Sequence, residues 1–352
     1  TPSPLSAEPL RELSPFCDSP TKMLLSATSE ALKSQTEVFN TEGNSLTRKQ
    51  YITEKKVFLH PAETGKSSAY FLIDARGEKP VTIAVIKPVF VDNKIIRGKG
   101  FSEFPGISHW ALPQREELAY QLAGDLGVST TTLIKLEAEP GNGKRICSLQ
   151  AFIPDLELIG LGINLENRIQ LLLEGKEEKL IDDKMTVVEL PEGEKLSLDE
   201  LQKMAMIQMM TGDLDINRSN FGLVRQEGKP YKIAVFDLAL CLSKQFIPPR
   251  RLLWINWDVM REPLSETSLK TLQASSWESK KDKLLAGRED DHELIETAFA
   301  YHTLTQTCLL KGMSPYDVAA CTMKDKWGIP SVLQYCVGVS RESEDFKTTF
   351  QE

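Results

Sequence analysis

LQKMAMIQMMTGDLDINRSNFGLVRQEGKPYKIAVFDLALCL, residues 201–242, is the stretch from which the rest of the chain can be interpreted. Its first part carries apolar side chains at helical spacing, namely Leu201, Met204, Ala205 and Met209. This spacing predicts an amphipathic helix. Ser197 and Glu200 form a capping box that would begin the helix, and Gly212 would end it. The apolar runs at residues 221–224 and 231–236 flank a turn and therefore predict a β-hairpin.

The polar loop between this helix and the hairpin contains side chains that phosphoryl transfer from ATP would use. Asp215 lies in the loop, Asn220 follows five residues later, and Asp237 ends the second strand. One carboxylate can orient or deprotonate the attacking hydroxyl, while an amide and a second carboxylate bind the metal ions that neutralise the phosphates. Asp and Asn also cap ordinary loops, so Asp215 and Asn220 taken singly are open to that interpretation. Asp237 is the stronger candidate, because a carboxylate after so apolar a strand is costly to desolvate without a partner.

Composition and charge exclude several classes of function. The chain has 352 residues and a net charge of −8, which argues against broad electrostatic binding to nucleic acid or to an anionic membrane. We therefore expect no nucleic-acid partner and at most a peripheral membrane contact. No apolar run is long enough to span a bilayer. The six cysteines form no CxxC pair, which favours reduced thiols in the cytoplasm, and the four histidines have no ligand spacing that would predict a zinc site.

Residue composition divides the chain into three parts. Residues 1–48 are rich in Ser and Pro and are predicted to be a flexible leader with one short helix near residues 22–33. Residues 49–153 read as strands with one helix, and residues 154–352 as a mainly helical part with a helical C-terminal extension. Residues 157–180 are amphipathic and favour a helix, and the acidic stretch that follows is expected to be a surface excursion. Trp254 and Trp257 fit either core packing or a contact with a membrane or substrate.

Two features of residues 49–153 are compatible with nucleotide binding. The first is a loop of small residues between two predicted strands, Gly65, Lys66, Ser67 and Ser68. Backbone N–H groups and hydroxyls of such a loop can lie over phosphates, although a plain hairpin turn explains it as well. A Walker A motif is excluded, because its first glycine would stand at position 60, which is His. The second feature is Lys87, which ends the strand at residues 81–86 and can pair with a phosphate or extend to the sheet edge.

The helix that follows offers a partner for this lysine. Pro113 lies near its predicted start and Gly127 ends it. Glu116 lies at the edge of the apolar stripe of this helix and is expected to reach Lys87. Glu117, the next residue, projects in a different direction around the helix axis and is expected to be solvated. A Lys–Glu ion pair that holds the lysine is a required part of kinase-type sites.

Taken in order, these segments resemble the catalytic domain of the phosphatidylinositol 3-/4-kinase superfamily, in particular type II phosphatidylinositol 4-kinases and their bacterial relatives. The resemblance covers about residues 57–243. The matching segments are Gly65-Lys66-Ser67-Ser68-Ala69-Tyr70-Phe71, Ile83-Ala84-Val85-Ile86-Lys87-Pro88, Arg115-Glu116-Glu117-Leu118-Ala119-Tyr120, Ser148-Leu149-Gln150-Ala151-Phe152, Gly212-Asp213-Leu214-Asp215 through Asn220, and Ile233-Ala234-Val235-Phe236-Asp237 followed by Leu240-Cys241-Leu242.

The resemblance implies an α+β fold of the two-lobed, atypical protein/lipid kinase type, with a β-rich N-lobe, a mainly helical C-lobe and ATP between them. It implies ATP and Mg²⁺ or Mn²⁺ as cofactors. Asp215 would be the catalytic base, Lys87 would hold phosphates and Glu116 would hold Lys87. Asn220 and Asp237 would bind the metal. The nucleotide would contact Gly65, Lys66, Ser67, Ser68, Lys87, Gln150 and Phe152.

The acceptor of the phosphoryl group is a separate question. The family has Arg-His after the catalytic Asp, where this chain has Ile216-Asn217, and often x-Gly after the metal-binding Asp, where it has Leu238-Ala239. We favour a protein Ser/Thr hydroxyl, because the sequence contains no clear membrane-binding feature. A phosphoinositide is the alternative, which Lys244, Arg250 and Arg251 could bind, and a pseudokinase or interaction module is a third. We expect a cytoplasmic location (host cytosol for a translocated bacterial effector) and allow for an inositol phosphate or protein activator.

Overall fold

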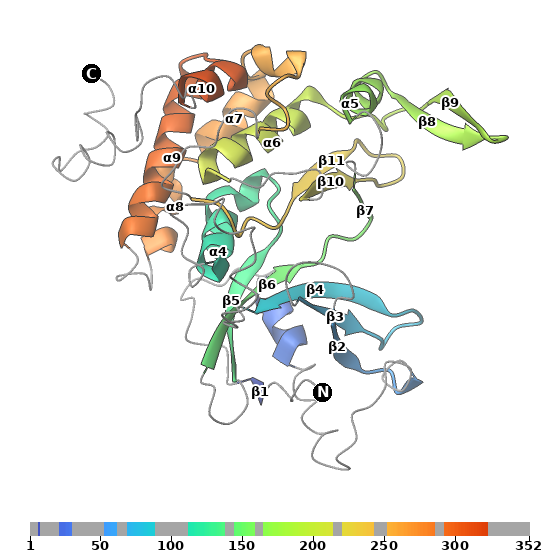
Figure 1. Cartoon of the computed structure of the whole chain (residues 1–352), viewed down its shortest axis with the longest axis vertical. Helices are drawn as coiled ribbons and strands as arrows, with labels where there is room; N and C mark the ends of the chain where they lie inside the picture. The colour runs from blue at the N-terminus through green and yellow to red at the C-terminus, as the bar shows by residue number, and fades with distance from the viewer. Residues whose placement is uncertain are drawn as a thin grey trace, which may run out of the picture.

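The computed structural model describes residues 6–7, 21–29, 53–61, 69–88, 112–137, 144–158, 165–213, 220–242, 252–285 and 292–322. A sheet-rich N-terminal part is followed by a mainly helical C-terminal part (Figure 1). This arrangement confirms the α+β class that the sequence predicts. None of the helices in these ranges combines the length and the apolarity that a bilayer crossing needs.

The N-terminal part is built on one antiparallel sheet with the strand order β1-β5-β6-β4-β3-β2. Its strands are β1 (Ser6–Ala7), β2 (Val57–Pro61), β3 (Tyr70–Asp74), β4 (Val81–Pro88), β5 (Thr131–Glu137) and β6 (Lys144–Ala151). β-branched and aromatic residues make up most of β3 and β4, as expected for a pleated, half-buried surface. Residues 21–29, within the segment predicted to be a leader, form a helix, and its Leu24 is buried with Leu72, Ile86 and Leu149 of the sheet.

Helix α4 (Leu112–Ala123) connects the two parts. A short 3-10 turn, η4 (Gly124–Leu126), extends it, and Gly127 ends it with a φ of 113°, a conformation that favours glycine. α4 packs against β5 and β6 on one side and against α6, α8 and α9 on the other. Its apolar residues, including Leu118 and Leu122, belong to the core of the helical part rather than to that of the sheet. By its packing, α4 is therefore a member of the C-terminal core.

The helical part is organised around α6 (Leu198–Thr211), in which every residue from 204 to 211 is buried. Trp254 and Trp257 are buried beside it, and the Trp254 indole donates to Gln208 Oε1 at 2.6 Å, which confirms core packing for this pair. The other helices are α5 (Leu165–Leu173), η7 (Asp258–Arg261), α7 (Glu266–Ala274), α8 (Trp277–Leu285), α9 (His292–Leu310) and α10 (Pro315–Thr322). A small sheet of order β11-β10-β7 borders them, made of β7 (Leu156–Glu157), β10 (Phe221–Val224) and β11 (Lys232–Val235).

Both ends of α6 are where the sequence predicts them. The Ser197 side chain accepts a hydrogen bond from Glu200 N at 3.3 Å and so caps the first turn. The Glu200 carboxylate accepts from Ile233 N at 3.0 Å, which fastens β11 to the helix. Gly212 ends the helix with a φ of 55° and lies against the ring of Tyr301.

Replacing Gly212 with Ala is expected to lower the free energy of unfolding by about 2–5 kcal/mol. A positive φ costs an L-residue about 1–2 kcal/mol, and forced overpacking costs about 1–3 kcal/mol more, because the new methyl group would overlap the Tyr301 ring. Urea unfolding measures the loss. Gly228→Ala is the matched control, since Gly228 also has a positive φ, 70°, but has open space around it. Equal losses in the two variants would contradict the steric argument.

Residues 176–189 differ from the prediction. The helix expected over residues 157–180 is restricted to α5, and the chain then forms a two-stranded hairpin of β8 (Lys176–Ile181) and β9 (Lys184–Glu189). Its two turn residues, Asp182 and Asp183, have φ values of 49° and 60°. Positive φ at both central residues is typical of the type I′ turn, whose twist matches that of paired strands. The acidic stretch is thus an ordered hairpin that extends from the helical part beside α5 (Figure 1).

His302 on α9 is a buried core histidine. Its Nε2–H donates to the Ser275 carbonyl at 2.8 Å, and its ring contacts the edge of Trp277. Burial, reinforced by the positive charge of Lys280, lowers the pKa of His302 to about 4 from 6.5. The ring is therefore neutral in the folded protein.

This histidine makes the folded state sensitive to acid. Between pH 6.5 and about 4 the unfolded chain binds a proton at His302 that the folded chain does not bind, so the free energy of unfolding falls as the pH falls. The loss should amount to about 3 kcal/mol across this window. We expect His302→Gln, whose amide can also donate to Ser275, to flatten the pH dependence measured by urea unfolding. An unchanged slope in the variant would contradict this assignment.

Candidate active site

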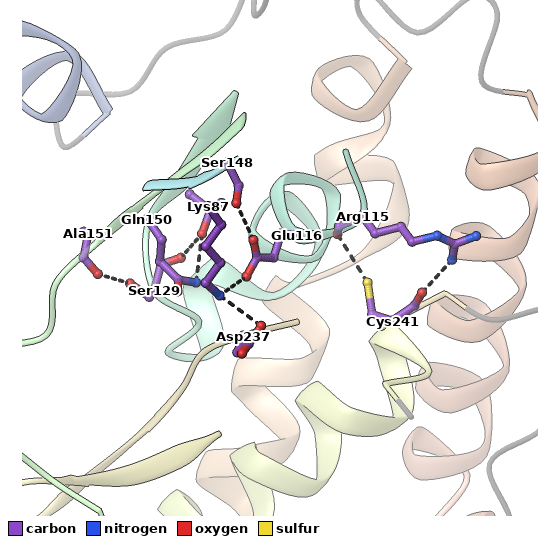
Figure 2. Close-up of polar contacts among 10 residues, drawn as sticks. Lys87, Arg115, Glu116, Ser129, Ser148, Gln150, Ala151, Asp237 and Cys241 are labelled. Atoms are coloured by element: carbon purple, nitrogen blue, oxygen red, sulfur yellow. Dashed lines mark hydrogen bonds and ion pairs between the residues drawn. The ribbon is translucent and has the colours of Figure 1, made fainter. Parts of the chain in front are cut away.

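A lysine from the sheet and a glutamate from α4 form the centre of the site (Figure 2). Lys87 Nζ of β4 lies 2.6 Å from Glu116 Oε1, as the sequence leads us to expect. Glu116 is only 2% exposed. A carboxylate so deeply buried must be paired and hydrogen-bonded, because desolvating an isolated charge is costly. Lys87 supplies the opposite charge.

Ser148 supplies a second hydrogen-bond donor to the Glu116 carboxylate. Its hydroxyl donates to Glu116 Oε2 at 2.5 Å, so each oxygen of Glu116 has its own donor. Ser148 lies on β6 directly opposite Lys87 on β4, so both side chains project from the same face of the sheet. No role was predicted for Ser148 by itself. Its position depends on the strand register, which the local sequence pattern does not reveal.

Asp237, from the C-terminal part of the chain, forms an ion pair with the same lysine. Its Oδ1 lies 2.9 Å from Lys87 Nζ, and its side chain is 46% exposed. It follows β11 and has a φ of 59°, a left-handed conformation that is uncommon for a residue with a side chain. Burial alone would lower the pKa of Lys87, but Glu116 and Asp237 outweigh burial and raise it above its usual range. The ammonium group is therefore permanently charged between two carboxylates.

Asn220 lies beside Phe236, the residue before Asp237, because of the hairpin register. Phe221 pairs with Val235, and the carbonyl of Asn220 accepts from Phe236 N at 3.0 Å. The residue before β10 and the residue after β11 therefore meet at the open end of the hairpin. The Asn220 side chain is buried.

This donor set has the chemistry of a site for a hard divalent cation. Carboxylate and amide oxygens are the ligands that Mg²⁺ and Mn²⁺ prefer, and Mg²⁺ is commonly bound by one or two carboxylates together with substrate phosphates. Within the described ranges, no group of three His, Cys, Asp or Glu side chains could hold a metal ion by itself. Asp237 and Asn220 are of the ligand types that such a cation takes.

Gln150 on β6 and Phe152 just after this strand are both predicted to contact the nucleotide. Gln150 is buried and donates to Thr131 Oγ1 at 3.3 Å, on the same face as Ser148 two residues earlier. Phe152 is 41% exposed and makes an edge contact with Phe71 of β3, and its N–H donates to the Ile83 carbonyl at 2.9 Å. Gln150 is thus part of the packed sheet, whereas the Phe152 ring is accessible.

Some of the predicted site residues lie outside the described residues. They are Gly65, Lys66, Ser67, Ser68, Asp215, Lys244, Arg250 and Arg251. Their assigned roles stay predictions.

The prediction for Glu117 is wrong. It was expected to be solvated, but it is 2% exposed and accepts a hydrogen bond from the Gln121 side chain one turn later. The reason is that α4 lies between the sheet and the helical core, so it is covered on more sides than a surface helix would be.

Comparisons with known proteins find distant structural similarity to kinases. No protein-family model matches the sequence, and no curated protein matches it. The structure is similar to that of the proinflammatory kinase CtkA of Helicobacter pylori, with a TM-score of 0.37, 10% identity, and coverage of 74% of this chain and 95% of that one. It is also similar to the Golgi casein kinase with Mn/ADP bound (TM-score 0.41, 13% identity, coverage 80% and 78%) and to another structure of that kinase (0.40, 14%, 94% and 97%). At such similarity, function has to be argued from the site itself.

Proposed function

We propose that this protein is a kinase that transfers the γ-phosphoryl group of ATP to an alcohol, with Mg²⁺ or Mn²⁺ as the metal cofactor. The observation that carries the proposal is the position of Lys87 between a buried carboxylate, Glu116, and a half-exposed one, Asp237. Glu116 fixes the lysine within the protein. Asp237 remains accessible, and the three groups together carry surplus negative charge, which favours a cation. A lysine on a strand, held by a glutamate on the next helix and facing a metal-binding aspartate, is the arrangement that kinases require.

Each residue has a distinct role in this proposal. Lys87 binds phosphate oxygens and Glu116 keeps its ammonium group in place. Asn220 and Asp237 would hold the metal ion, which supplies charge neutralisation on the phosphates when bound. Asp215 accepts the proton of the acceptor hydroxyl as its oxygen forms a bond to the γ-phosphorus and the bond to the ADP oxygen breaks. The loop formed by Gly65, Lys66, Ser67 and Ser68 would cover the phosphates, while Gln150 and Phe152 would contact the nucleotide.

A protein Ser/Thr hydroxyl is the acceptor that we favour. The net charge of −8 opposes approach to an anionic lipid surface, which a phosphoinositide substrate would require. The phosphoinositide alternative relies on Lys244, Arg250 and Arg251 as partners of an inositol phosphate group. With a protein acceptor, a cytoplasmic location is expected, and an inositol phosphate or a protein could act as activator.

Transfer of labelled phosphate from ATP tests the proposal. Wild type and Asp237→Asn would be incubated with Mg²⁺ or Mn²⁺ and, in separate reactions, with no acceptor, with a cell lysate, or with phosphoinositide vesicles. Label on protein that is absent in the variant supports the favoured acceptor, and label only on lipid replaces it with the alternative. Nucleotide at 100 times its Kd should also stabilise the wild type by about 2.7 kcal/mol. Stabilisation without transfer, with an inositol phosphate present, would indicate a pseudokinase. The absence of both stabilisation and transfer would overturn the proposal.

A further inference from the structure

Arg115, the residue before Glu116, joins α4 to the segment that follows Asp237. Glu116 faces the sheet, and Arg115 extends to the other side of the helix, toward Cys241 (Figure 2). Its Nη1 donates to the carbonyls of Cys241 and Leu242 at 2.6 and 2.5 Å. In return, the Cys241 thiol donates to the Arg115 carbonyl at 3.3 Å. Three hydrogen bonds therefore connect one turn of α4 to this segment.

The segment from Asp237 to Leu242 is compact and fastened at its far end. Cys241 N donates to the Leu238 carbonyl at 3.2 Å, which closes a turn, and Leu242 N donates to the Thr211 carbonyl at the end of α6 at 2.7 Å. Asp237 and Leu242 both have positive φ values, 59° and 53°, so the backbone departs from an extended path at each end. The position of Asp237 therefore depends on the contacts that anchor the turn from Asp237 to Leu242.

A purely structural purpose explains Arg115 poorly. The side chain is 5% exposed, and burial lowers its pKa. Among the described carboxylates none forms an ion pair with it, and its Nε has no hydrogen-bond partner within the described part of the chain. Burying a guanidinium group in this way costs several kcal/mol, and an apolar residue of similar volume would often stabilise the fold as well or better.

We infer that Arg115 is a positioning residue, which holds Asp237 at the correct place relative to Lys87 and Glu116 by binding the carbonyls of Cys241 and Leu242. The inference rests on the proposed function, in which Asp237 binds the metal ion. Because Arg115 and Glu116 are neighbours in α4, one helix orients the lysine through Glu116 and the metal-binding aspartate through Arg115. The separation between these two groups is then set by a single rigid element.

Two substitutions at Arg115 test this inference. In Arg115→Met, which keeps the apolar stem but removes the donors, the Kd of Mn²⁺ for the protein with ADP should rise about 10-fold or more, the range seen when groups that orient metal ligands are removed. The Kd is measured by electron paramagnetic resonance of Mn²⁺. The kcat should fall more than the KM for ATP rises, because Lys87 and Glu116 remain paired. Arg115→Lys, which keeps a charged donor, should recover part of the Mn²⁺ affinity.

Lys280→Met is the matched control. Lys280 of α8 is also a buried cation, and it donates to the Leu122 carbonyl and to Asp125 Oδ1 (2.8 Å) at the opposite end of α4. Its replacement removes a buried cation next to α4, as in Arg115→Met, but should leave the Mn²⁺ affinity unchanged. Wild-type affinity in Arg115→Met, or equal weakening in Lys280→Met, would overturn the positioning role alone. If wild type with ADP binds no Mn²⁺, the proposed function itself fails.

Discussion

Replacing Asp237 with Asn should lower the kcat of phosphoryl transfer at least about 1000-fold, because metal coordination is worth several kcal/mol of transition-state stabilisation and each 1.36 kcal/mol is tenfold in rate. The amide has nearly the same shape as the carboxylate but lacks its charge, so it binds a divalent cation much more weakly. Lys87 retains its contact with Glu116, at 2.6 Å, and therefore stays in place.

The fold should tolerate this change. The Lys87–Asp237 ion pair involves a side chain that is 46% exposed, and such pairs contribute at most about 1 kcal/mol. A Tm close to that of wild type is therefore expected beside the loss of kcat. Asp258→Asn is the control, because the Asp258 side chain is fully exposed and belongs to η7, outside the site. Loss of activity in the control, or retention of activity in Asp237→Asn, would contradict the role of Asp237.

Replacing Lys87 with Met should reduce both activity and stability. Activity is lost because no cation remains to bind the phosphates. Stability falls because the Glu116 carboxylate is 2% exposed and loses its cationic partner. Within the described part of the chain, the Ser148 hydroxyl is then its remaining hydrogen-bond donor. Removing one partner of a buried ion pair costs about 3–5 kcal/mol, because a buried charge is left uncompensated.

A double variant separates the two effects of Lys87. Lys87→Met/Glu116→Gln removes the buried negative charge as well, and the Gln side chain can still accept from Ser148. Replacing both partners of a buried pair is often close to neutral, so urea unfolding should show that most of the lost free energy returns while activity stays absent. A single variant as stable as wild type would show that Glu116 is not effectively buried. A double variant no more stable than the single one would show that the loss has another origin.

The elements that follow from local pattern agree with the structure. α6 is defined by its apolar spacing, by Ser197 at its start and by Gly212 at its end, all within a short stretch of chain. The β10–β11 hairpin likewise follows from two apolar runs about a turn. The contact of Glu116 with Lys87 was predictable because strand alternation and helix periodicity each orient one of the two side chains.

β5 and the β8–β9 hairpin were not predicted, for identifiable reasons. β5 contains the run Thr131-Thr132-Leu133-Ile134, whose β-branched residues indicate a strand, although no element was predicted at these positions. The β8–β9 hairpin carries charged residues on both strands and turns through Asp182-Asp183 rather than through a glycine. Its apolar residues Leu180, Met185 and Val187 are exposed, so no burial pattern marks it as a strand pair.

The sequence by itself determined which residue types are available for the chemistry: a strand lysine, a helix glutamate, and Asn and Asp residues at the ends of a hairpin. Only the tertiary structure decided that Ser148 completes the shell of Glu116, that Glu117 is buried, and that Arg115 joins α4 to the turn after Asp237. The physical reason is the range of the interactions. Caps, turns and amphipathic periodicity act within about four residues along the chain. Strand register and the burial of α4 between a sheet and a helical core depend on segments that are far apart in the sequence.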